Sequence, residues 1–219
     1  MRLVPQLRLA VVALAAGWLT PAAPAQVATL SLQSQPGDYI GQGQNLTITY
    51  TVSEISAGVR RFANGDPAGV AFTVGQVIPD PNTYSTLNFG TDALGTLFQS
   101  GVYGLPGNTA QRAPFAQPGH AGLDVTFQNR GSNNLNGNFT INNLSLYTDQ
   151  SGILQIGSFA ASFEQHSEGA APALFGQFSY TGVPEPSVLA MVGLAAAGFG
   201  LCRRSKGPAA TRRGDKGDI

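Results

Sequence analysis

Strict alternation of apolar and polar side chains is the feature that most constrains the fold of this chain. Along residues 46–53, four apolar side chains alternate with three threonines and a serine. Residues 123–128 alternate in the same way, and residues 139–146 do so with a slip of one position at Asn142 and Asn143. Period two places successive side chains on opposite faces of a strand, so each segment predicts a half-buried strand. The slip predicts a β-bulge or a tight turn.

Further apolar runs predict strands at residues 28–33, 70–74, 97–103, 153–163 and 174–180. No segment between residues 26 and 182 has helical periodicity. We therefore expect an all-β domain, a single antiparallel sandwich or jelly-roll-like arrangement of about eight or nine strands. The turn-rich stretches 78–85 and 105–122 are expected to be surface loops, and loops of this length often carry function.

The domain is mildly acidic, because residues 26–182 hold four arginines, no lysine and nine acidic side chains. Nucleic acids and anionic membranes bind basic faces, so we expect no nucleic-acid partner. The single cysteine, Cys202, lies outside this range, which predicts a domain without a disulfide. A domain of this length forms a core without a metal or disulfide, and we expect no cofactor.

The N-terminus has the order of a secretory signal. Arg2 and Arg8 precede an apolar stretch at residues 9–19, and residues 23–25 form an A-x-A cleavage site. The apolar stretch is too short to span a bilayer comfortably. We predict that residues 1–25 are a signal peptide, which signal peptidase removes after the general secretion machinery exports the chain.

The C-terminus combines a chain break, an apolar segment and a basic cluster. The break consists of Val183, Pro184, Glu185 and Pro186. Residues 187–202 carry no charge, and Arg203 and Arg204 begin a basic cluster that ends at Lys206. An apolar helix of this length nearly spans a bilayer, and the basic cluster would hold its end on the cytoplasmic side. Residues 207–219 are expected to form a charged, disordered tail.

Residues 183–206 resemble the PEP-CTERM sorting signal. This resemblance implies a partner, an exosortase, which is a membrane-embedded cysteine protease or transpeptidase of Gram-negative bacteria that produce extracellular polysaccharide. It further implies that the precursor sits in the inner membrane through its C-terminal helix and is processed near Pro184 to Pro186. The product would then reach the cell surface or the extracellular matrix. The continuation beyond Lys206 departs from the family, whose tails usually stop soon after the arginines.

Short segments of the domain are also familiar: residues 37–41, 111–115, 130–133, 137–139, 163–169 and 172–174. Together they resemble an uncharacterised family of exported bacterial β-domains that bears an F-E-Q-H-C-E-G motif. Ser132 and Ser167 stand where that family has two cysteines. The paired loss implies a disulfide in the relatives, so we expect the Cα atoms of these serines to lie within about 7 Å of each other.

Residues 164–168, Glu-Gln-His-Ser-Glu, form the densest polar cluster of the domain. On a strand, Glu164, His166 and Glu168 would share one face, a spacing that suits a divalent metal or an acid–base pair. Phe159, Ala161 and Phe163 would then line the core.

The alternative for this cluster is structural. Glu164 or His166 would pair with an arginine such as Arg112 or Arg130 and brace the sheet, and we favour this alternative because many ion pairs have no catalytic role. His120, in the loop 105–122, is expected at the surface.

The domain contains no G-x-S-x-G, no CxxC and no phosphate-binding glycine loop. We therefore predict a non-enzymatic surface or matrix protein associated with extracellular polysaccharide, for which Tyr39, Tyr84 and Tyr103 are candidate sugar contacts. One alternative is a secreted metal-dependent or carboxylate-based hydrolase that acts on polysaccharide through the Glu164 cluster. Another is a structural matrix component without a ligand site.

Overall fold

The computed structural model describes residues 25–75 and 84–182, in which the all-β prediction is confirmed. In chain order the elements are β1 (Val27–Ser34), β2 (Asn45–Thr51), the 3-10 turn η1 (Val52–Glu54), β3 (Ile55–Arg61), β4 (Pro67–Val74), β5 (Ser85–Gly90), β6 (Gly101–Tyr103), β7 (Ala110–Arg112), β8 (Gly122–Thr126), β9 (Leu135–Thr148), β10 (Leu154–Ser167) and β11 (Ala173–Thr181). The predicted C-terminal sorting signal and nearly all of the signal peptide lie outside the described residues. Within the described ranges, no helix is long and apolar enough to cross a membrane.

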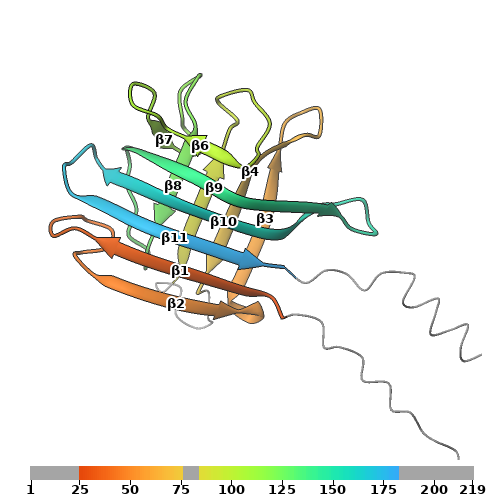
Figure 1. The fold of residues 1–219 in the computed structure, drawn as a ribbon, viewed down its shortest axis with the longest axis horizontal. Coiled ribbons are helices and arrows are strands. Elements are labelled where there is room, and N and C mark those ends of the chain that lie inside the picture. The colour runs from red at the N-terminus through yellow and green to blue at the C-terminus, as the bar shows by residue number, and fades with distance from the viewer. Residues whose placement is uncertain (1–24, 76–83, 183–219) are drawn as a thin grey trace, which may run out of the picture.

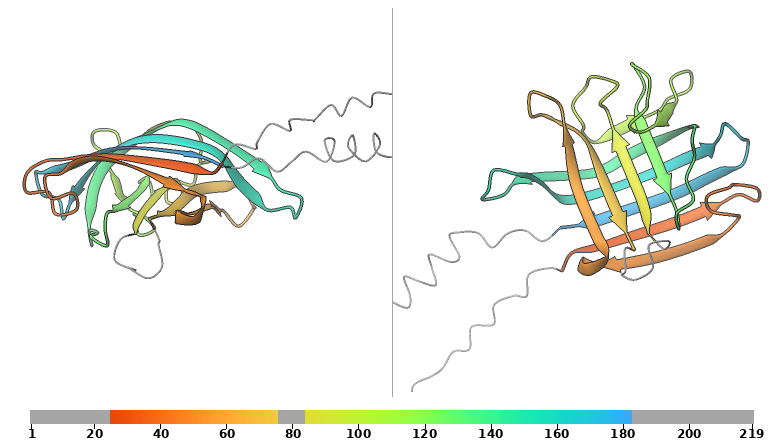
Figure 2. Two further views of the ribbon diagram at one scale, coloured as in Figure 1. Left: turned by 90° about the horizontal axis from the view of Figure 1, so that it is seen from below. Right: turned by 180° about the vertical axis from the view of Figure 1, so that it is seen from behind.

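All strands in the described ranges belong to one sheet that folds back on itself. Its order is β2-β1-β11-β10-β9-β7-β8-β5-β4-β3, and β6 pairs with β9 beside this path. Figure 1 shows β2, β1, β11, β10 and β9 as a front layer, whose strands cross those of a back layer made of β8, β5, β4 and β3. Figure 2 shows the long front strands arching over the back layer.

The expectation of a wholly antiparallel arrangement is wrong at the junction between the layers. β7 lies between β9 and β8, and it pairs with β8 in parallel through Gln111 and Arg112. Parallel neighbours require a crossover connection, and the loop 113–121 provides it.

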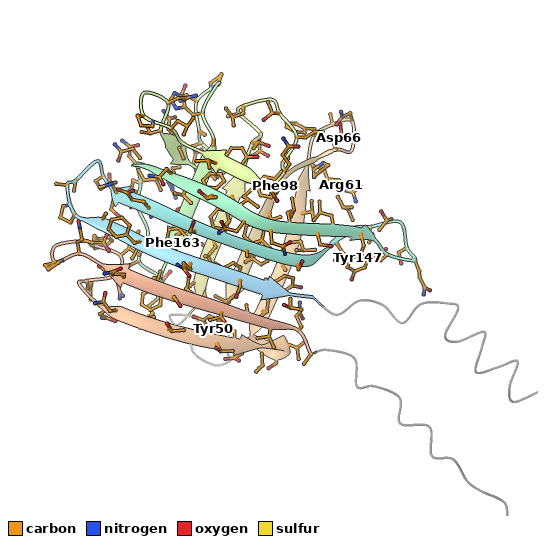
Figure 3. The ribbon with its side chains drawn as sticks, viewed as in Figure 1. Tyr50, Arg61, Asp66, Phe98, Tyr147 and Phe163 are labelled. Atoms are coloured by element: carbon orange, nitrogen blue, oxygen red, sulfur yellow. The ribbon has the colours of Figure 1, made fainter. Side chains whose placement is uncertain are left out.

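Aromatic side chains fill the space between the layers. Phe72 of β4 lies 5.3 Å from Phe159 of β10 and 4.7 Å from Phe178 of β11, measured between ring centroids. Phe89 of β5 lies 5.4 Å from Phe139 of β9. Each ring buries a large apolar area, and tilted pairs add about 1 kcal/mol beyond that burial. Figure 3 labels two further buried aromatic residues, Phe98 and Phe163.

The core face predicted for β10 is confirmed, because Phe159, Ala161 and Phe163 are all buried. The bulge in β9 is also confirmed. Ile141 pairs with Ala161 and Asn143 with Ala160, so Asn142 is the extra residue. Because of the extra residue, the apolar side chains after the bulge return to the core face of β9. Leu144 and Leu146 therefore pack against the core.

Strand prediction failed where the alternation is weak. β3 contains Gly58 and two arginines, and β7 has only three residues, so neither gives a clear pattern. β5 begins at the end of a stretch expected to be a loop. The strand expected at 97–103 is reduced to Gly101–Tyr103.

Candidate functional site

Glu164 and His166 form a hydrogen-bonded pair on the outer face of β10. Glu164 Oε1 lies 2.9 Å from His166 Nε2, and Glu164 Oε2 accepts a hydrogen bond of 3.0 Å from Asn138 Nδ2 on β9. The other ring nitrogen of His166, Nδ1, lies 3.1 Å from the carbonyl oxygen of Ala170. Both ring nitrogens of His166 thus lie within hydrogen-bonding distance of oxygen atoms of the protein.

The surroundings of Glu164 favour its ionised form. The hydrogen bond from His166, followed by the one from Asn138, lowers the pKa of Glu164 below its usual range. A carboxyl group with a lowered pKa is ionised near neutral pH and is a poor general acid. The pair is therefore better suited to accepting hydrogen bonds from a ligand than to donating a proton.

Glu168 does not join this pair, which corrects the expectation that the three side chains share one face. β10 ends at Ser167, and Glu168 adopts a left-handed backbone conformation with φ of 54°. Its Oε1 accepts a hydrogen bond of 2.6 Å from the backbone N–H of Asn133. Within the described part of the chain, no three metal-ligating side chains gather at one place.

Neither arginine expected to brace the cluster contacts it. Arg112 instead lies 3.5 Å from Asp124, measured from Nε to Oδ2, and its guanidinium lies 5.3 Å from the ring centre of Phe115. Burial raises the pKa of Asp124 to about 6, although the charge of Arg112 acts in the opposite direction. Arg130 Nε donates a hydrogen bond of 2.8 Å to the carbonyl oxygen of Ile40.

Glu164 and His166, near the C-terminal end of β10, border a hollow of about 420 Å³. A second hollow, of about 530 Å³, adjoins the first, because Thr109, Asn136 and Gly169 line both. We call the two together the amide groove, which is lined among others by Thr109, Arg112, Phe115, Gln117, Asn133, Asn136, Asn138 and His166. Phe115 is 68% exposed within it. The groove thus combines an accessible aromatic face with many amide donors and acceptors.

The stretch 105–122, which contains β7 at Ala110–Arg112, forms one wall of this groove. That it carries function stays a prediction. His120 is only partly exposed, and its Nδ1 lies 2.8 Å from the carbonyl oxygen of Thr109. The three candidate tyrosines do not line the groove. Tyr103, for example, stacks on Phe139 at 4.9 Å.

Gln165 lies beneath the site, and its role was not predicted, although it belongs to the polar cluster at residues 164–168. Its side chain is fully buried, and its amide exchanges hydrogen bonds of 2.9 and 3.0 Å with the backbone N–H and C=O of Val125 on β8. This contact joins β10 to the back layer directly beneath Glu164 and His166. An amide at an inward position of an alternating strand was the available signal.

Ser132 and Ser167 are both buried, at 3% and 4% exposure. Each hydroxyl oxygen lacks a hydrogen-bond partner among the described residues. Their neighbours join the two segments, because Glu168 accepts the backbone hydrogen bond from Asn133. The expected separation of the two Cα atoms stays a prediction.

Comparison with known proteins identifies only the C-terminal end. A family model described as the PEP-CTERM protein-sorting motif matches residues 182–204. The chain carries a PEP-CTERM sorting motif. This motif implies an exported, membrane-anchored precursor that an exosortase processes, as the sequence predicted. No curated protein and no solved structure matches the chain. The resemblance of the domain to F-E-Q-H-C-E-G proteins stays a prediction.

Proposed function

We propose that the domain of residues 26–182 is a non-enzymatic cell-surface or matrix module that binds extracellular polysaccharide in the amide groove. The observation that carries this proposal is the groove itself, in which the exposed Phe115 ring lies among asparagine and glutamine side chains. Sugars present apolar ring faces and many hydroxyl groups, and an aromatic face with amide partners complements both.

The charges of the groove favour a neutral glycan. Arg112 is engaged with Phe115 and Asp124, and Glu164 is engaged with His166. The acidic excess of the domain opposes binding of strongly anionic polymers. The contacts of the two glutamates weaken the hydrolase alternative. Glu164 is held ionised, and Glu168 accepts a hydrogen bond from the backbone of Asn133.

The sorting motif supports the proposed place of action. The signal peptide exports the chain, and an exosortase processes it near Pro184–Pro186 in the inner membrane. The domain then remains at the cell surface or in the extracellular matrix of a Gram-negative bacterium, where polysaccharide is concentrated. Mass spectrometry of the surface fraction tests this route, since chains that still carry residues 187–219 there would contradict it.

A glycan array with the 26–182 fragment tests the binding function. We expect binding to neutral glycans, weakened about tenfold by Phe115→Ala because the ring stacks on the ligand. Tyr39→Ala is the matched control, since Tyr39 is an aromatic residue that is 59% exposed outside the groove. Equal effects of the two substitutions would reject the groove as the binding site. A fragment that binds no glycan would leave the structural matrix role.

A further inference from the structure

The sheet has two ends, β2 and β3, and they differ in how well they are protected. Figures 1 and 2 show β2 as the outermost strand of the front layer. Among the described residues, only β1 pairs with it. A strand at a sheet edge presents unpaired N–H and C=O groups, which are a template for another strand.

β3 carries features that discourage such pairing. It ends in Arg60 and Arg61, and its register with β4 shifts between these two residues. Charges and irregularities of this kind protect edge strands in natural proteins. β2, with the sequence NLTITYT, has no charge, no proline and no glycine. Its threonines, isoleucine and tyrosine have high strand propensity.

The β2 sequence is also complementary to itself. If two β2 strands pair antiparallel about Ile48, Thr47 of one copy faces Thr49 of the other. On the opposite face, Leu46 faces Tyr50, which Figure 3 labels on this strand. Thr–Thr and aromatic–aliphatic pairs are both favourable across antiparallel strands. Tyr50 is already buried in one copy, at 5% exposure, whereas Leu46 and Ile48 are half-buried, so the apolar surface left to cover belongs to Leu46 and Ile48.

We propose that the β2 edge binds the same edge of a second copy of this chain, antiparallel and with Ile48 at the two-fold axis. The front layers of the two copies then form one continuous sheet, and the interface is isologous. A seven-residue strand buries less surface than a standard interface, so the dimer forms at high local concentration. The amide groove lies on β9 and β10, at the other side of the front layer, and this inference does not depend on glycan binding.

Two charge variants of the full chain test the register. Thr47 and Thr49 are exposed, and each contacts a hydroxyl of β1, at 2.8 Å for Ser31 and 3.4 Å for Thr29. The variant Thr47→Lys/Thr49→Lys places lysines opposite each other at both symmetry-related positions of the dimer. The variant Thr47→Lys/Thr49→Glu loses the same two contacts but creates two opposite-charge pairs. We expect the dissociation constant of the first variant to exceed that of the second about tenfold, as measured by sedimentation.

Cysteine cross-linking provides a second measurement on the full chain, in a Cys202→Ser background. We expect a mixture of Thr47→Cys and Thr49→Cys chains to form disulfide-linked dimers faster than either variant alone. In the control mixture, chains with Ser56→Cys, at an exposed position of β3, replace the Thr47→Cys chains. Preferential linkage of Thr49→Cys to Ser56→Cys would overturn the proposal in favour of head-to-tail assembly. A chain that stays monomeric at every concentration, or equal dissociation constants for the two charge variants, would also overturn it.

Discussion

The outer and inner faces of β10 carry similar polar side chains in very different surroundings. On the outer face, His166 and Glu164 contact each other while 27% and 34% of their side chains stay exposed. On the inner face, Gln165 and Ser167 are 0% and 4% exposed, and Gln165 bonds to the backbone of β8. Polar residues consecutive in sequence therefore divide into a pair that borders a groove and a pair that belongs to the core.

The side chains on the inner face of β10 should contribute more to the free energy of unfolding than those on the outer face. Replacement of Gln165 should have the largest effect and therefore tests this difference first. Gln165→Leu keeps a similar volume but leaves the N–H and C=O of Val125 buried without partners. We expect the free energy of unfolding to fall by about 4 kcal/mol, measured by urea denaturation. Gln177→Leu, at an exposed position of β11, is the control and should change it by less than about 0.5 kcal/mol. Similar losses for the two variants would remove the distinction between the faces.

The second inner-face test concerns the two buried serines. The double variant Ser132→Cys/Ser167→Cys should form a disulfide on oxidation and raise the free energy of unfolding by about 3 kcal/mol relative to its reduced form. Mass spectrometry and thermal unfolding measure the two effects. Thiols that stay free under oxidising conditions would show that the side chains do not meet.

Buried and exposed carboxyl groups should also differ in their pH dependence. The pKa of Asp124 is raised to about 6, so the folded state holds this proton more tightly than the unfolded state. The contribution of Asp124 to the free energy of unfolding is therefore greatest in acid and falls, by about 2 kcal/mol, as pH rises from about 4 to about 6. Asp124→Asn should remove this slope in unfolding measured across that range. An unchanged slope would place the titration elsewhere.

The smallest effect is expected on the outer face. Because the pKa of Glu164 is lowered, its contribution is present above the unfolded pKa and is lost as pH falls through the folded pKa. Glu164→Gln should change the free energy of unfolding at pH 7 by less than about 1 kcal/mol, because water reaches the partly exposed pair with His166 and screens it. The same variant should alter glycan binding on the array. A variant that unfolds readily but binds normally would reverse the roles of the two faces.

Much of the fold was predictable because alternation is a local property. The β9 bulge and the buried face of β10 both follow from the order of apolar residues. The partners of the ionic groups were not predictable, since Arg112 reaches Asp124 only because β7 and β8 lie parallel. Glu168 was misplaced because the strand period was extended one residue beyond the true end of β10.

The sequence by itself determined the class of fold and the sorting motif at residues 182–204, because both are written in contiguous residues. The tertiary structure alone decided that Phe115 and His166 border one groove and that β2 is left at an edge. These features join segments that are far apart in the chain. Their positions depend on the return of one sheet over itself, which periodicity within a single strand does not specify.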